Sequence, residues 1–131
     1  MKFYDSYGKT RNLKNPKKYL IDWDGSSRSK FQNNVKNFLR DYWFNDIVFE
    51  EFRVVGSRLS LDFYNANKKI AIEVQGAQHL KYVKHFHKNK LKYLDQLKRD
   101  QKKLDFCEIN GIKLVTSLFQ SIVMMQLKKK Y

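Results

Sequence analysis

The chain has 131 residues and a mass of 15.8 kDa, the size of one domain with a substantial buried core. Its 27 lysine and arginine residues exceed its 13 aspartate and glutamate residues, so the formal net charge is +14. An aromatic content of 15% excludes a disordered basic tail. No stretch approaches the ~20 apolar residues of a membrane span, and the first residues lack the apolar core of a secretory signal. A folded, cytoplasmic protein with a polyanionic partner is therefore expected.

The positive charge is concentrated in two segments. Residues 1–30 carry a net charge of +5 and residues 81–103 a net charge of +7, whereas residues 31–80 are neutral. One lysine-rich run is usually a solvated face. Two runs around a neutral centre favour contacts with the phosphates of double-stranded DNA. The candidate DNA-binding residues come from the second segment: Lys81, Lys84, Lys88, Lys98, Arg99, Lys102 and Lys103.

Residues 1–28 are interpreted as a basic N-terminal arm, and residues 29–131 as the folded domain. The arm shows no clear periodicity, and one short helix is expected near Lys17–Trp23. Its aromatic side chains either pack onto the core or stack against bases. These side chains are Phe3, Tyr4, Tyr7, Tyr19 and Trp23.

The domain is expected to begin with a helix over residues 29–43, preceded by serines with N-cap chemistry. Apolar residues there recur with helical spacing, at Phe31, Val35, Phe38, Leu39 and Tyr42. Three strands follow in a meander, with turns at Gly56-Ser57 and Asn65–Lys69. They are expected at Ile47–Val55, Leu59–Tyr64 and Ile70–Gln75.

A second helix is expected from about His87 to Asn110, because Gly111 is a favourable C-terminal stop. Its apolar stripe would contain Leu91, Leu94, Leu97, Leu104 and Cys107. A short strand at Ile112–Thr116 and a closing helix at Ser117–Leu127 complete the order α-β-β-β-α-β-α. This order predicts the α/β (α+β) class, with a single four-stranded mixed sheet flanked by helices on both faces.

Two acidic residues are placed inside predicted strands. Asp62 lies between Leu61 and Phe63, and Glu73 lies in the third strand. Pairing across the turn at 65–69 brings the two carboxylates opposite each other, where they repel unless a cation lies between them. The simpler alternative is that each has a basic partner, such as Arg53 or Lys113.

Two further residues are candidates because of their positions near these strands. His79 lies just beyond the third strand, where loops build sites. Asp100 lies between Leu97 and Leu104 on the second helix, so it is expected to point along the apolar stripe toward the sheet. The alternative for Asp100 is a salt bridge to Lys103 or Arg99.

At these positions the sequence resembles a known group of enzymes. The pieces are LDFY, then IAIEVQGAQH, then a basic helix with RDQKK, a cysteine and NGIKLV. Together they are similar to the PD-(D/E)XK nuclease superfamily, in particular the branch of the very-short-patch repair endonuclease and the EDxHD-type homing endonucleases of phages and introns. The resemblance covers about residues 29–116.

The resemblance implies a restriction-endonuclease-like fold and a DNA endonuclease that depends on Mg²⁺ or Mn²⁺. It implies that Asp62 is the central metal ligand and that Glu73 occupies the second acidic position. His79 matches the histidine that orients or deprotonates the attacking water, and Asp100 matches the later acid that holds this histidine or the second metal shell. Mg²⁺ held by two carboxylates would neutralise and polarise a phosphodiester.

The sequence departs from the superfamily pattern at two positions. Gln75 replaces the lysine that follows the second acid, so His79 or Lys102 would have to substitute for it. Gln32 is nearest to the place of the first-helix glutamate, and Glu50 or Glu51 is the alternative source of that acid.

The leading hypothesis is a phage or intron-associated homing or nicking endonuclease. It would act on duplex DNA without any small-molecule cofactor beyond the metal. The alternative is a non-catalytic nucleic-acid-binding module on a nuclease scaffold. A third hypothesis, a basic structural protein of a nucleic-acid assembly, predicts no carboxylates buried in strands.

Overall fold

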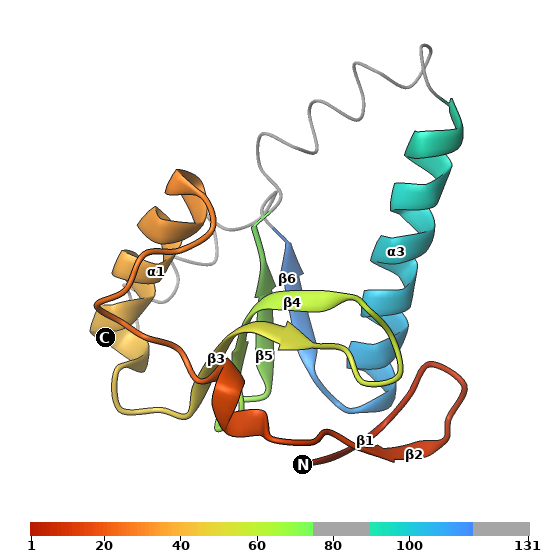
Figure 1. Ribbon diagram of the computed structural model, residues 1–131, viewed down its shortest axis with the longest axis horizontal. Helices are drawn as coiled ribbons and strands as arrows, with labels where there is room; N and C mark the ends of the chain where they lie inside the picture. Colours follow the sequence, from red (N-terminus) through yellow and green to blue (C-terminus); the bar gives the residue numbers. More distant parts are fainter. Residues whose placement is uncertain (75–89, 117–131) are drawn as a thin grey trace.

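The computed structural model describes residues 1–74 and 90–116 (Figure 1). Over these residues it contains a two-stranded hairpin, a 3-10 turn, two α-helices and a four-stranded mixed sheet, which together form a small α+β domain. In chain order the elements are β1 (Lys2–Tyr4), β2 (Thr10–Asn12), η1 (Pro16–Tyr19), α1 (Lys30–Trp43), β3 (Val48–Arg53), β4 (Ser60–Asn65), β5 (Ile70–Glu73), α3 (Lys90–Ile109) and β6 (Lys113–Thr116).

The main sheet has the strand order β3-β4-β5-β6. The first three strands form an antiparallel meander, and β6 pairs parallel to β5 after the long connection that a parallel pair requires. The turn between β3 and β4 contains Gly56 at a φ of +81°, a conformation that glycine adopts without steric cost. The predicted mixed sheet is therefore confirmed. The predicted closing helix at Ser117–Leu127 lies outside the described residues.

Helix α1 begins where the sequence predicts. The Ser29 side chain accepts a hydrogen bond from the Gln32 backbone N–H at 3.1 Å, which satisfies one of the unpaired donors of the first turn. One face of the helix is buried against one face of the sheet. The core on this side contains Val35, Leu39, Trp43, Val48, Phe63, Ile72 and Val115. Helix α3 covers the opposite face, so the predicted arrangement of helices on both faces is confirmed (Figure 1).

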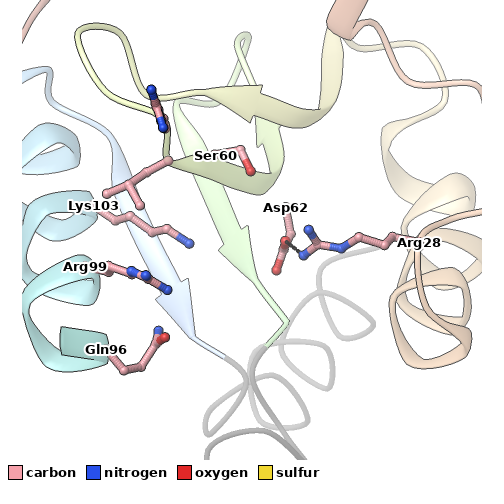
Figure 2. A pocket seen from close by; sticks show the side chains of 8 residues that line it. Arg28, Ser60, Asp62, Gln96, Arg99 and Lys103 are labelled. Atoms are coloured by element: carbon pink, nitrogen blue, oxygen red, sulfur yellow. Dashed lines mark ion pairs between the residues drawn. The ribbon is translucent and has the colours of Figure 1, made fainter. Parts of the chain in front are cut away.

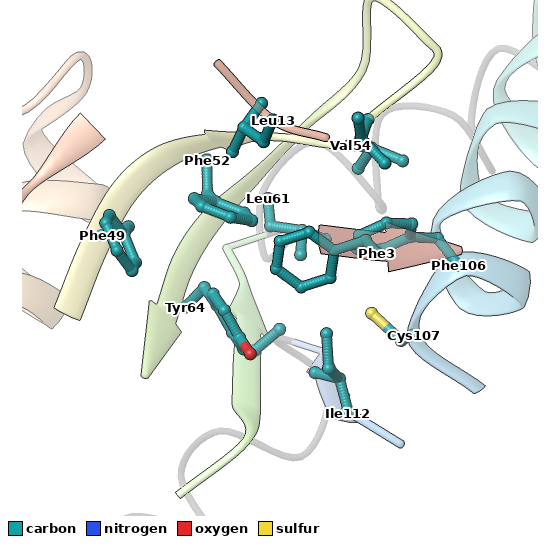
Figure 3. Packing of buried hydrophobic residues seen from close by; sticks show 12 residues of the cluster. Phe3, Leu13, Phe49, Phe52, Val54, Leu61, Tyr64, Phe106, Cys107 and Ile112 are labelled. Carbon is teal, nitrogen blue, oxygen red and sulfur yellow. The ribbon is translucent and has the colours of Figure 1, made fainter. Parts of the chain in front are cut away.

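The core on the α3 side of the sheet includes Phe52, Tyr64 and Phe106, and the hairpin β1-β2 packs onto it (Figure 3). Phe3 is buried there and meets Phe52 edge to face, with ring centroids 5.7 Å apart. Tyr19 also packs against this core, whereas Tyr4 and Tyr7 are exposed. Trp23 packs against the other core, so three of the five aromatic residues of the arm contact the core, and stacking against bases stays a prediction for Tyr4 and Tyr7. The short helix is a 3-10 turn at Pro16–Tyr19 and not the expected segment at Lys17–Trp23.

The predicted apolar stripe of α3 is wrong for its four leucines and confirmed only for Cys107. Leu91 is 76% exposed, and the other leucines of the stripe are exposed as well. Phe106 and Cys107, near the end of the helix, are the buried residues, because the sheet contacts α3 there and the earlier turns carry polar side chains beside it. None of the helices in the described part of the chain combines the length and apolar character that crossing a membrane requires.

Candidate active site

Two buried carboxylates lie side by side on neighbouring central strands. Phe63 of β4 pairs with Ile72 of β5, so the next pair along the ladder is Asp62 and Glu73, as the sequence predicts. Their exposed fractions are 8% and 2%. The Asp62 backbone N–H donates to Glu73 Oε2 at 2.9 Å, and the Val74 N–H donates to Asp62 Oδ2 at 2.7 Å. These bonds fix both carboxylates at the end of the sheet.

Each carboxylate also has a basic neighbour, and neither neighbour is one that the sequence suggested. Lys103 of α3 donates from Nζ to Glu73 Oε1. Arg28, just before α1, places a guanidinium nitrogen 3.8 Å from Asp62 Oδ1. Figure 2 shows Arg28 approaching Asp62 from one side, with Lys103 on α3 at the other side. The expected partners, Arg53 and Lys113, do not pair with these carboxylates.

The surroundings of Asp62 strongly disfavour its charged form. Burial is the largest cause and the neighbouring Glu73 charge the second, and together they raise the pKa of Asp62 from 3.8 to about 8. Lys103 opposes this effect but does not cancel it. A cation held by the Asp62 and Glu73 carboxylates would offset this effect, because it would favour their charged forms.

A third carboxylate, that of Glu51, is connected to Asp62 through a shared arginine. Glu50 pairs with Phe63 and Phe52 with Leu61, and the regular β3–β4 pairing is interrupted between them, at Glu51 and Asp62. Arg28 connects the two, because its other terminal nitrogen lies 3.6 Å from Glu51 Oε2. Glu51 has a φ of +54°, which costs a non-glycine residue about 1–3 kcal/mol. Such strain concentrates at functional sites.

Gln32 of α1 is joined to the same acids. Its buried Nε2 donates to Glu50 Oε2 at 2.9 Å and to Glu51 Oε1 at 3.0 Å. Lys36, which is also buried, pairs with Glu50 at 3.1 Å. The first-helix position singled out in the sequence therefore leads to Glu50 and Glu51, the two residues proposed as alternative acids. Of the two, Glu51 is the one that shares Arg28 with Asp62, which only the tertiary structure could show.

A pocket of about 230 Å³ opens at this end of the sheet, between α3 and the segment before α1 (Figure 2). Among the described residues, Asp62 is the only acidic one that lines this pocket. Its lining residues are Arg28, Arg58, Leu59, Ser60, Asp62, Gln96, Arg99 and Lys103. Arg58 comes from the turn between β3 and β4 and had no role in the sequence interpretation.

Some of the remaining candidate residues lie in the described part of the chain, and others lie outside it. Asp100 is half-buried and accepts a hydrogen bond from Gln96 Nε2 at 2.8 Å, but Gln96 and not Asp100 lines the pocket. Its expected direction rested on Leu97 and Leu104 facing the sheet, and both are exposed, so that argument fails. Lys98 and Lys102 are exposed on α3. Gln75, His79, Lys81, Lys84 and Lys88 lie outside the described residues.

The donor set at Asp62 and Glu73 fits a hard divalent cation. Mg²⁺ and Mn²⁺ prefer carboxylate oxygens, and Mg²⁺ typically takes one or two carboxylates and completes its shell with water and substrate phosphate. Residues 1–74 and 90–116 contain no group of three or more histidine, cysteine, aspartate or glutamate side chains placed to hold a metal. Within the part of the chain that the structure describes, Asp62 and Glu73 are therefore the residues that would hold the ion.

Comparison with known proteins gives partial matches to viral proteins. Uncharacterized protein 307L of Invertebrate iridescent virus 6 is 40% identical over 57 residues, which is 44% of this chain and 29% of that protein. Uncharacterized protein 094L of Frog virus 3 is 46% identical over 61 residues, or 46% of this chain and 39% of the relative. Uncharacterized protein 033L of Invertebrate iridescent virus 3 is 32% identical over 62 residues, or 47% and 32%. No known family model and no solved structure matches the chain.

Proposed function

We propose that this protein is a metal-dependent endonuclease that hydrolyses phosphodiester bonds of duplex DNA. The observation that carries the proposal is the Asp62–Glu73 pair, two buried carboxylates fixed next to each other beside a cationic pocket. Burying two acids in neighbouring strands costs several kcal/mol unless a cation compensates. Such a cost is expected where the pair has a function.

The residues of the pocket would divide the work between metal and substrate. Asp62 and Glu73 would hold Mg²⁺ or Mn²⁺, which supplies charge neutralisation and polarisation of the phosphate when it is bound. Arg99 and Lys103 line the same pocket and would attract the phosphate backbone. Lys103 contacts Glu73, so its ammonium group would take the role of the superfamily lysine that Gln75 replaces in the sequence.

The resemblance and the strand order support a narrower version of the proposal. The elements α1, β3, β4, β5, α3 and β6 would form a restriction-endonuclease-like core, and the enzyme would be a homing or nicking endonuclease. His79 would orient or deprotonate the attacking water, as the resemblance implies. Asp100 on α3 would hold this histidine or the second metal shell, as the resemblance also implies.

A second candidate is a DNA-binding module without catalysis. One observation favours it: Lys103 and Arg28 already place positive charge at Glu73 and Asp62. The carboxylates of such a module would be satisfied by these side chains and would not need a metal.

Plasmid cleavage separates the two candidates. Purified full-length protein is incubated with supercoiled and linear DNA in Mg²⁺, in Mn²⁺ and in EDTA. Nicked or linear product with either metal, its absence in EDTA and its absence with Asp62→Asn would support the endonuclease. DNA binding by a parent protein that leaves the plasmid intact under every metal condition would instead support the binding module.

A further inference from the structure

The pocket beside Asp62 collects positive charge from three separate parts of the chain. Arg28 precedes α1, Arg58 lies in the turn between β3 and β4, and Arg99 and Lys103 lie one turn apart on α3. Arg28 and Lys103 pair with the carboxylates described above. Arg58 and Arg99 form no ion pair with any carboxylate of the described residues. The pocket therefore has two guanidinium groups whose charge is not compensated there.

The turn that carries Arg58 is held in place by its own hydrogen bonds. Ser57 Oγ donates to the Val54 carbonyl at 2.7 Å, and the Leu59 N–H donates to Ser57 Oγ at 3.1 Å. The Val54 N–H also donates to the Leu59 carbonyl at 2.9 Å. A fixed turn keeps Arg58 at the pocket although its side chain is exposed. Like charges are held together at a cost, which an anion between them would remove.

The size and lining of the pocket restrict the anion. Its volume of about 230 Å³ is below the ~300–1,000 Å³ of typical small-molecule sites. Nearly all lining side chains are polar, and the lining contains no aromatic ring on which a base would stack. Guanidinium groups bind phosphate oxygens through two parallel hydrogen bonds, which makes phosphate the best match among small anionic groups.

We propose that Arg58 and Arg99 together bind one backbone phosphate of a DNA strand beside the Asp62–Glu73 pair. Lys103 connects the phosphate site with the carboxylate pair, because it lines the pocket and donates to Glu73. The identity of the ligand as DNA rests on the proposed function; the phosphate site itself rests on the pocket. We call Arg58 and Arg99 the clamp. It would place the strand so that a neighbouring phosphodiester lies at the two carboxylates.

A double-mutant cycle tests the clamp. Binding of a fluorescein-labelled duplex to the full chain is measured by anisotropy in metal-free buffer for the parent, Arg58→Gln, Arg99→Gln and the double variant. Each single variant should weaken binding about 10-fold or more. Because both side chains hold the same phosphate, the double variant should lose less than the product of the two single losses.

Arg40→Gln is the matched control. Arg40 pairs with Asp24 at 2.8 Å and is absent from the pocket lining, so its loss removes one guanidinium without touching the site. Its effect on binding should be within about twofold. Single variants that behave like this control, or losses that simply multiply, would overturn the shared clamp.

Inorganic phosphate distinguishes the source of the anion. At constant ionic strength, phosphate should compete with the duplex more strongly for the parent than for Arg58→Gln. If phosphate alone raises the melting temperature of the parent while both arginine variants bind DNA normally, the pocket takes a free anion and the DNA assignment is wrong. Metal-dependent cleavage by a parent whose arginine variants bind and cut normally would remove the clamp and leave the endonuclease. The converse, a coupled clamp without cleavage, would support the clamp and reject the endonuclease.

Discussion

Replacing Asp62 with asparagine removes one buried charge and little else. Asparagine has the same shape, and its carbonyl oxygen can accept the Val74 N–H that Asp62 Oδ2 accepts at 2.7 Å. Its amide group can donate a hydrogen bond to a carboxylate such as that of Glu73, which lies on the neighbouring strand. The variant should therefore fold and reveal the energetic effect of the charge itself.

The expected magnitude follows from the pKa of Asp62. An unfolded aspartate ionises near 3.8, whereas burial and the Glu73 charge raise this pKa to about 8 in the folded protein. Between these values the folded state binds the additional proton, so stability falls as pH rises from about 4 to about 8. At ~1.4 kcal/mol per pH unit the upper limit of this loss is about 6 kcal/mol. The measured loss should be smaller, because Arg28 and Lys103 can move toward the ionised carboxylate.

Urea denaturation at several pH values measures this effect. Asp62→Asn should match the parent near pH 4 and be the more stable protein above pH 8, in metal-free buffer. Asp41→Asn is the control, since Asp41 is exposed on α1. Its stability difference from the parent should show no comparable change over this range.

Divalent cations should make the parent more stable than Asp62→Asn, the reverse of the order expected above pH 8 without metal. Mg²⁺ should raise the melting temperature of the parent and leave that of Asp62→Asn unchanged. Below pH 8 the ion must displace a proton from Asp62, so its apparent affinity should rise about tenfold per pH unit. If the stability difference between the parent and Asp62→Asn is equal at pH 5 and pH 9, ionisation of buried Asp62 does not destabilise the fold and the reasoning is refuted. Cleavage of DNA by Asp62→Asn at the parent rate would refute the site.

Three further outcomes are expected. Phe52→Ala should cost about 3–5 kcal/mol of unfolding free energy, because Phe52 is completely buried, whereas Phe31→Ala at an exposed position should cost far less. The Cys107 thiol, whose burial raises its pKa to about 12, should resist alkylation until the protein is unfolded by denaturant. Replacing exposed Lys98 and Lys102 with glutamine should flatten the slope of log affinity for DNA against log salt concentration by about 1 for each phosphate that is no longer neutralised.

Local patterns in the sequence located most of the elements near the site. The helical spacing of Val35, Leu39 and their neighbours placed α1, and the Ser29 cap placed its first residue. Alternation and turn residues placed β3, β4 and β5 within one or two residues. Since register follows from the turn, the approach of Asp62 to Glu73 could also be predicted.

The sequence did not determine which face of α3 meets the sheet. Leu91, Leu94 and Leu97 form the stronger apolar pattern, yet these side chains are exposed, and Gln96 and Lys103 line the pocket. A periodic pattern gives the direction of each side chain around a helix axis but not the position of the neighbouring elements. The hairpin that buries Phe3 depends in the same way on contacts with residues far along the chain.

The sequence by itself determined a basic α+β chain with two acids at matching positions in adjacent strands. Only the tertiary structure decided what surrounds those acids. Arg28, Arg58 and Lys103 come from a loop, a turn and a helix that are distant in sequence and meet at one pocket. Strand pairing across a short turn is a local property, whereas the charge around a buried carboxylate depends on how all the elements pack.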